Sequence, residues 1–381
     1  MPVTYLDNAA TSFPKPESVY RQLDRFAREN LANPGRTSHK MALAAEQEIH
    51  QCRHLLNQLF QGEGAERFIF TLNCTDSLNI AIKGLLQRGD HVVTTNLEHN
   101  SVSRPLEALV DAGLITLHRV AADATGTVQP EAIRAALTPQ TKLVVLTHAS
   151  NVLGTIQPVA EIGSIIRKQG SYLLVDAAQT AGVVPIDIRQ MQIDLLALPG
   201  HKALLGPTGT GVLYVGTRVT LHPWREGGTG GDSMSRVQPV ELPFQLEGGT
   251  PNVLGIAGLR AGIEYVLEHS LEKIWKHENA LVSRLVDYLQ SREEFTIYGH
   301  LETDRRVGTL SFSHPALESP DLAAILDTSF DIAVRPGLHC SPYIHRSLGT
   351  APRGTLRVSP GVFNTEKDID LLIRALNEIL L

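Results

Sequence analysis

The segment LLALPGHKALLGPTGTGVLYVG, residues 195–216, decides the fold. It consists of an apolar run typical of a buried strand, a His–Lys pair, a Gly/Pro-rich turn and a second apolar run. Lys202 therefore follows the carboxyl end of a strand, and open α/β sheets bind their ligands at that edge. The plainer interpretation is a surface lysine in a connecting loop, but the flanking strands favour a functional site.

The stretch that leads to this segment alternates β-rich runs with helical patterns. The strand candidates, including both ends of the segment, are residues 67–71, 91–95, 142–148, 171–176, 194–200 and 210–216. The helical patterns are residues 76–86, 102–112, 130–136 and 159–168. Near-continuous apolar runs such as KLVVL are typical of strands buried on both faces. We therefore predict an α/β fold with a mostly parallel sheet covered by helices.

The pattern changes after this α/β stretch. Residues 223–235 and 245–252 are Gly-rich and aperiodic, as functional loops and linkers are. Residues 253–289 carry the pattern of one kinked helix or of two helices. We predict a large domain over residues 16–255 and a smaller α+β domain over residues 256–381 together with residues 1–15.

Composition narrows the classes of function. The 381 residues are 43% hydrophobic and 19% charged, which suits a chain with a sizeable core and excludes a disordered one. A net charge of -6 without a dense basic stripe argues against nucleic-acid binding. The sequence shows no secretory leader pattern and no apolar run of membrane-spanning length, so we expect the cytoplasm. Three cysteines, Cys52, Cys74 and Cys340, are too few for a disulfide framework.

Asp176 ends the buried run SYLLVD, with Gln179 three residues further on. A buried carboxylate needs a cationic partner, because an unpaired buried charge is very costly. The protonated ring nitrogen of a pyridine cofactor would supply that cation, and an imine with Lys202 would hold the other end of the cofactor. The alternative is an aspartate that caps the next helix.

Two further strand ends carry polar residues. RFIFTLNCTDSLNIAIKGLL, residues 67–86, predicts a strand, a polar turn and a helix that begins near Asp76. The free N–H groups of such a helix start form a phosphate site, here flanked by Cys74 and Thr75, although an ordinary cap explains the same residues. His99 follows another strand end, where it either stacks on a flat cofactor ring or serves as a capping or surface histidine.

Two residues near the carboxyl terminus carry reaction-specific chemistry. Cys340 lies in a Gly/Pro-bounded loop next to His339 and near Arg335, and positive charge from these two residues would raise its thiolate fraction. A thiolate is a good nucleophile toward sulfur, whereas the alternative is a small apolar residue beneath a loop. Arg357 either clamps an amino-acid carboxylate with two parallel hydrogen bonds or forms a surface ion pair.

Taken in order along the chain, these motifs resemble those of the fold-type I pyridoxal-phosphate (PLP) enzymes of the class V aminotransferase group. More narrowly, they resemble the short-loop cysteine desulfurases. The motifs are YLDNAATS (5–12), NCTDSLN (73–79), LEHNSV (97–102), THASNVLGT (147–155), VDAAQ (175–179), PGHKALLGPTGTGVLYV (199–215), EGGTPN (247–252), RPGLHC (335–340) and TLRVSPGVFNTEKDID (355–370). The resemblance implies a seven-stranded large domain, PLP as cofactor and L-cysteine as substrate. It also implies a cytoplasmic homodimer that transfers sulfur for iron–sulfur cluster assembly.

The resemblance further implies a role for each matching residue. Lys202 is the Schiff-base lysine, Asp176 the pyridinium partner, and His99 the stacking histidine that moves protons. Cys340 attacks the substrate sulfur and carries the resulting persulfide, while L-alanine leaves. The other matching residues comprise Gln179 and Asn151 at the phenolic oxygen, Cys74, Thr75 and His201 at the phosphate, Thr250 at the phosphate of the neighbouring subunit, and Arg357, Asn8 and His39 at the substrate.

Some features depart from the family pattern, and some alternatives stay open. Leu338 stands where many short-loop members have a second histidine, Cys74 stands where Thr is common, and residues 341–354 form an insertion. These departures concern substrate preference and the sulfur-acceptor protein. A selenocysteine lyase, a cyst(e)ine C–S lyase or a class V aminotransferase is the alternative enzyme. A non-catalytic sulfur- or metal-binding module is disfavoured because the three cysteines form no CxxC pair, and we expect no metal.

Overall fold

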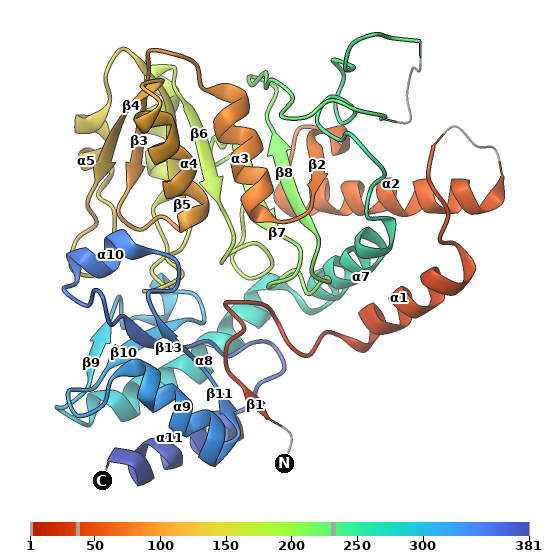
Figure 1. The fold of residues 1–381 in the computed structure, drawn as a ribbon. Coiled ribbons are helices and arrows are strands. Elements are labelled where there is room, and N and C mark those ends of the chain that lie inside the picture. Colours follow the sequence, from red (N-terminus) through yellow and green to blue (C-terminus); the bar gives the residue numbers. More distant parts are fainter. Residues whose placement is uncertain (1–2, 36–38, 230–233, 381) are drawn as a thin grey trace.

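A seven-stranded sheet forms the centre of the larger part of the molecule (Figure 1). The computed structural model describes residues 3–35, 39–229 and 234–380. In spatial order the strands are β2 (Phe68–Thr71), β8 (Gly211–Val215), β7 (Leu195–Pro199), β6 (Tyr172–Asp176), β5 (Thr141–Thr147), β3 (Asp90–Thr95) and β4 (Ile115–Val120). Strand β8 pairs antiparallel with both β2 and β7, and the other four strand pairs of this sheet are parallel. The predicted α/β fold with a mostly parallel sheet is confirmed.

Helices bury both faces of this sheet (Figure 1). In β5, Leu143 and Val145 pack with α3 (Cys74–Leu85) and α4 (Asn100–Asp111). Val144 and Leu146 point to the opposite face, because successive side chains of a strand alternate between its two sides. That face is covered by α2 (Lys40–Phe60), α5 (Pro130–Ala136), α6 (Val159–Gln169) and α7 (Val253–His269).

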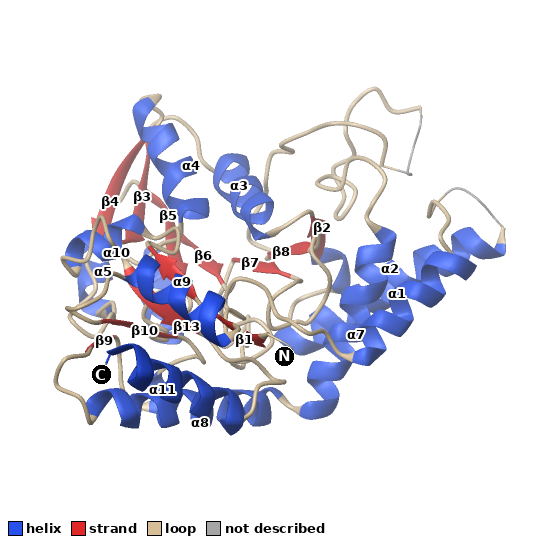
Figure 2. Cartoon of the chain, turned by 60° about the horizontal axis from the view of Figure 1, so that its bottom comes forward, coloured by secondary structure: helices blue, strands red, loops and turns tan. Residues whose placement is uncertain are grey.

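A second, antiparallel sheet forms the smaller part of the chain. Its order is β12 (Arg335–Gly337), β13 (Thr355–Val358), β10 (Leu310–Ser313) and β9 (Thr296–Tyr298). Its apolar face packs on α8 (Leu271–Gln290), α9 (Ser319–Phe330) and α11 (Glu366–Leu380), and α11 lies along α8 (Figure 2). Beside it, β1 (Thr4–Tyr5) pairs with β11 (Ile332–Ala333), while α10 (Pro342–Ser347) lies between β12 and β13 in the chain. This arrangement is the α+β part that the sequence predicts.

Two chain segments connect the two parts, one before the first strand of the large sheet and one after its last strand. After β1, residues 6–16 cross to α1 (Glu17–Glu29), which packs with α2 against α7. Ser270 separates α7 from α8 at a φ of 69°, so the long helical pattern is two helices. Among the described residues, no helix combines the length and the apolar character that crossing a membrane requires. The domain division at residue 255 stays a prediction, and residues 1–2, 36–38, 230–233 and 381 of the predicted ranges lie outside the described residues.

Four elements of the large-sheet part differ from the sequence-based expectations. Strand β4 was not among the predicted strands because it lies at the sheet edge and alternates buried with exposed residues instead of forming an apolar run. Helices α1 and α2 also lay outside the predicted set. Helix α3 begins at Cys74 rather than near Asp76, since Asn73 supplies the cap. This start places Cys74 and Thr75 within the first helical turn.

Candidate active site

A cavity of about 210 Å³ lies at the carboxyl ends of β5, β6 and β7, where Thr147, Asp176 and Pro199 end the strands. This is the edge at which open α/β sheets bind ligands. The cavity brings together the predicted residues Cys74, Thr75, His99, Asn151, Asp176, Gln179, His201, Lys202 and Arg357. These residues come from strands, loops and the first turn of α3, and they span the chain from α3 to β13.

Lys202 lies in the tight turn after β7. The turn is closed by the Gly206 N–H, which donates to the Gly200 carbonyl oxygen at 2.8 Å. Ser12 Oγ donates to the Lys202 carbonyl oxygen at 2.8 Å, so the N-terminal segment holds this turn from outside. Burial lowers the pKa of Lys202 to about 8, although the Asp176 carboxylate opposes the shift. A lysine of lowered pKa is suited to forming an imine and to accepting a proton.

Asp176 ends β6 and is buried, with 3% of its surface exposed. Its Oδ1 accepts hydrogen bonds from the Ala178 N–H at 2.9 Å and from Cys74 Sγ at 3.6 Å. Among the described residues no cationic side chain forms an ion pair with it. Burial raises its pKa, and the Lys202 charge counteracts this. Turns rather than a helix follow β6, so the helix-cap interpretation is wrong.

The first turn of α3 forms one end of the cavity. Asn73 Oδ1 accepts the Asp76 N–H at 2.9 Å, and Thr75 Oγ1 lies 2.7 Å from Ser101 Oγ. The first-turn N–H groups of a helix have no acceptor within the helix, which makes such an end suitable for a phosphate. Burial raises the pKa of Cys74 well above its ordinary value, and Asp176 adds to the shift, so Cys74 is a neutral thiol donor.

Two histidines of the cavity are neutral at pH 7. His99 Nδ1 accepts the Ser101 N–H at 3.1 Å and caps α4, so this histidine both caps a helix and lines the cavity. Burial, then the charge of Lys202, lowers the pKa of His99 to about 4. His201 Nδ1 lies 3.0 Å from Thr11 Oγ1, and burial lowers its pKa to about 4. Because Nδ1 of His99 is a hydrogen-bond acceptor, the proton of this neutral ring lies on Nε2.

Arg357 lies on β13 with 1% of its surface exposed. Its Nη2 donates to Asp7 Oδ1 at 2.6 Å and its Nη1 to the Asn151 carbonyl oxygen at 3.1 Å. Burial lowers its pKa and the Asp7 carboxylate raises it, and a guanidinium stays protonated throughout. The surface ion pair considered for Arg357 is thus a buried pair on the cavity wall.

Cys340 lies beside the cavity in an exposed position. Its carbonyl oxygen accepts the Asn100 N–H at 2.7 Å, and the preceding His339 carbonyl accepts Asn151 Nδ2 at 2.6 Å, so the loop is tied to the large sheet. Arg335 Nη2 lies 3.8 Å from Cys340 Sγ. His339 is buried, which lowers its pKa to about 2. The expectation that His339 adds positive charge near the thiol is wrong, and of these two residues it is Arg335 that carries the charge.

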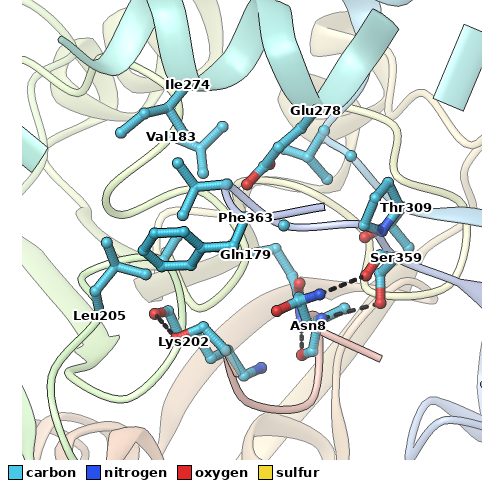
Figure 3. A pocket seen from close by; sticks show the side chains of 18 of the residues that line it. Asn8, Gln179, Val183, Lys202, Leu205, Ile274, Glu278, Thr309, Ser359 and Phe363 are labelled. Carbon is cyan, nitrogen blue, oxygen red and sulfur yellow. Dashed lines mark hydrogen bonds between the residues drawn. The ribbon is translucent and has the colours of Figure 1, made fainter. Parts of the chain in front are cut away.

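A second, smaller cavity of about 50 Å³ adjoins the first (Figure 3). Gln179 and Lys202 line both cavities, whereas Asn8 lines only the second one. Asn8 Nδ2 donates to the Ser359 carbonyl oxygen at 3.1 Å, and Gln179 Nε2 donates to the Ala9 carbonyl at 3.2 Å. Glu278 faces this cavity from α8 without a hydrogen-bond partner among the described residues (Figure 3).

Three predicted residues line neither cavity: Cys340, described above, His39 and Thr250. His39 is exposed and caps α2 by accepting the Ala42 N–H at 3.2 Å. Thr250 is exposed in the segment before α7. Conversely, two further residues belong to the site. Asp7 pairs with Arg357 and has no predicted role, and Arg335, predicted only as a charge near Cys340, lines the cavity. Asp7 stands in the quoted YLDNAATS motif, but no local pattern reveals a partner 350 residues away.

The residues of the larger cavity fit a phosphorylated pyridine aldehyde. A helix N-terminus suits the phosphate, a lysine suits the aldehyde, and a buried carboxylate without a cationic partner suits a protonated ring nitrogen. The residues support a metal site less well than a pyridine cofactor. His50 and His54 stand four residues apart on α2, but no group of three possible metal ligands occurs in the described part of the chain.

Comparison with known proteins agrees with this chemistry. The Aminotransferase class-V family model matches residues 4–372. A probable cysteine desulfurase of Halalkalibacterium halodurans is 34% identical over 99% of this chain and 93% of its own length. A probable cysteine desulfurase of Methanothermobacter thermautotrophicus is 36% identical over 98% of this chain and 94% of its own length.

Solved structures show the same similarity. The apo structure of a cysteine desulfurase from Thermococcus onnurineus has a TM-score of 0.93 at 33% identity, covering 99% of this chain and 94% of that one. A cysteine desulfurase from Escherichia coli, solved in an S-sulfonic acid form, has a TM-score of 0.89 at 28% identity. It covers 99% of this chain and 94% of that one.

Proposed function

Since the chain belongs to the class-V aminotransferase family and, within it, to the cysteine desulfurases, we propose that it converts L-cysteine to L-alanine with PLP as cofactor and passes the sulfur to Cys340. The observation that carries the proposal is the placement of Lys202 and Asp176 on one cavity, with the exposed Cys340 beside Arg335 at its edge. The family resemblance drawn from the sequence motifs is confirmed.

The cofactor would be held at three points. Lys202 would bind its aldehyde carbon, Asp176 would pair with its ring nitrogen, and the first turn of α3 with Thr75 would bind its phosphate. His99 would lie against the ring, with Asn151 and Gln179 toward the phenolic oxygen and Cys74 and His201 toward the phosphate. When bound, PLP supplies an electron sink for the bonds at the substrate Cα.

Side chains of the protein would carry out substrate binding, proton transfer and sulfur transfer. Arg357 binds the substrate carboxylate, and the Lys202 amine removes the Cα proton. His99, whose neutral ring carries its proton on Nε2, would move protons to or from the substrate thiol. The Cys340 thiolate then attacks the substrate sulfur. A sulfur–sulfur bond forms and the Cβ–sulfur bond breaks. The substrate Cβ keeps the electron pair and is protonated, and Lys202 returns a proton to Cα, which gives L-alanine.

A homodimer is part of the proposal. Thr250 is exposed and does not line the cavity of its own chain, so a phosphate contact by Thr250 requires a second copy. Val237 and Val240, both 75% exposed, and Phe244, 44% exposed, lie in the same segment before α7. Several exposed apolar side chains within one short segment favour an interface there. Sedimentation at micromolar concentration tests this part, and a monomer that binds PLP tightly would contradict it.

The fate of the sulfur is the remaining part. An exposed persulfide on Cys340 can be reached by a second protein, so we expect a sulfur-acceptor protein and a place in iron–sulfur cluster assembly in the cytoplasm. His39 stays a predicted substrate contact, and Asn8 would act next to the substrate from the smaller cavity.

The test is L-alanine formation from L-cysteine by the PLP-loaded protein. Lys202→Ala should form no L-alanine, because Lys202 is the one lysine among the described residues that line the larger cavity. The matched control is Lys83→Ala, which removes an exposed lysine of α3 and should leave turnover unchanged. Turnover by the Lys202 variant would contradict the proposed function.

A further inference from the structure

Asp7 holds the arginine that the proposed function assigns to the substrate carboxylate. The two side chains form an ion pair of 2.6 Å, in which Arg357 is 1% and Asp7 19% exposed. A pair so shielded from water is screened little by salt and keeps a fixed geometry. Asp7 itself does not line the cavity, so it acts on the site through Arg357.

A second arginine stands next to the first. Arg335 of β12 lies directly opposite Arg357 in the pairing with β13, and both arginines line the cavity. Like charges directly opposite each other destabilise a strand pair unless an anion compensates them. In the described ranges Arg335 forms no ion pair, and its Nη2 points to Cys340 Sγ at 3.8 Å.

Asp7 is therefore the carboxylate that compensates this arginine pair. Two guanidinium groups and one carboxylate leave one net positive charge at this end of the cavity. A single positive charge matches a ligand with one carboxylate. A ligand with a second acidic group would bring excess negative charge close to Asp7, and charges interact strongly where water is excluded.

We propose that Asp7 sets the charge of the amino acids that this site accepts, favouring those with a neutral side chain over those with a second acidic group. The inference rests on the proposed function in one respect, the binding of the substrate carboxylate by Arg357. It adds Asp7 as a specificity-determining residue that acts on the substrate through Arg357.

The test compares L-aspartate with L-asparagine, which has nearly the same shape without the second charge. Both dissociation constants are measured by calorimetry on the PLP-loaded protein, before and after Asp7→Asn. The asparagine amide oxygen can still accept from Arg357, so the substitution removes the charge and keeps an acceptor. We expect the affinity ratio to move toward L-aspartate by roughly tenfold, the effect of removing one nearby charge.

The matched control is Asp370→Asn, which removes the same charge from an exposed pair with Arg284 at 2.6 Å. It should leave the ratio unchanged. Equal weakening of both ligands by Asp7→Asn would show that Asp7 only holds Arg357 in place, and would overturn the inference, as would an unchanged ratio. If the unsubstituted protein binds neither ligand nor L-cysteine, the proposed function itself fails.

Discussion

Cys74 Sγ lies 3.6 Å from Asp176 Oδ1, at the point where the first turn of α3 meets the end of β6. A neutral thiol and one backbone N–H are thus the hydrogen-bond donors to this buried carboxylate. Neither carries a positive charge, so the carboxylate is left to pair with a cation inside the cavity. The contact also joins the predicted phosphate end of the site to the predicted ring-nitrogen end.

Asp176→Asn should leave a protein that binds PLP and turns over poorly. An amide of the same shape cannot keep a ring nitrogen protonated, so L-alanine formation should fall on the order of 100-fold. Absorbance of the bound cofactor and L-alanine formation are measured on the same sample. Near-normal turnover would show that Asp176 has a purely structural role.

The three cysteines should differ in their reactivity toward iodoacetamide at pH 8. Burial raises the pKa of Cys52 and Cys74, whereas Cys340 is exposed and lies 3.8 Å from Arg335 Nη2. Mass spectrometry of digested protein should find the label on Cys340 first. Arg335→Gln should slow that labelling several-fold by removing the nearby charge. Faster labelling of Cys74 would contradict the assignment of the reactive thiol.

Glu247 should be important for stability. Its carboxylate accepts from Arg53 at 2.6 and 2.9 Å and from the Phe70 N–H at 2.6 Å, and the Arg53 side chain is 5% exposed. Glu247→Ala would leave Arg53 buried and unpaired, which should lower the free energy of unfolding by about 3 kcal/mol. Urea denaturation measures the change. Glu272→Ala, which breaks an exposed pair with Lys276, should have little effect.

Glu278 should make the stability of the protein depend on pH. Burial raises its pKa from 4.5 to about 8, so the folded protein retains a proton that the unfolded chain releases. The stabilisation is complete below pH 4.5 and is lost as the pH rises toward 8, at up to about 1.4 kcal/mol per pH unit. Glu278→Gln does not titrate, so its advantage over the unsubstituted protein should grow between pH 5 and pH 8.

Urea denaturation at both pH values gives this difference. The exposed Glu366→Gln is the control, and its stability should follow that of the unsubstituted protein at both pH values. A constant difference between Glu278→Gln and the unsubstituted protein would show that Glu278 is already ionised in the fold.

Local patterns explain what the sequence could predict. Asp176 ends, and Lys202 follows, an apolar strand buried on both faces, and the strand order brings these two strand ends together. The sequence does not predict the edge strand β4, because its exposed residues interrupt the apolar run. The start of α3 was misplaced by two residues because Asn73, not a residue after it, supplies the capping oxygen.

Long-range contacts explain what the sequence could not predict. Arg357 pairs with Asp7 across 350 residues of chain, and the register of β12 and β13 places Arg335 opposite Arg357. His339 is polar in sequence but buried in the fold, where its Nε2 lies 3.2 Å from the Thr355 carbonyl oxygen. Whether a charge is paired or a histidine is neutral depends on such tertiary contacts, which no local pattern contains.

The persulfide on Cys340 is the central claim, and mass spectrometry tests it most directly. PLP-loaded protein is incubated with L-cysteine, alkylated and digested, and the added sulfur is mapped to a peptide. We predict one extra sulfur on the peptide that contains Cys340 and none on those with Cys52 or Cys74. Cys340→Ser should remove the label and lower L-alanine formation by orders of magnitude, while Cα proton exchange, which uses Lys202, persists. Sulfur on Cys74, or full desulfurase activity in the Cys340 variant, would contradict the account.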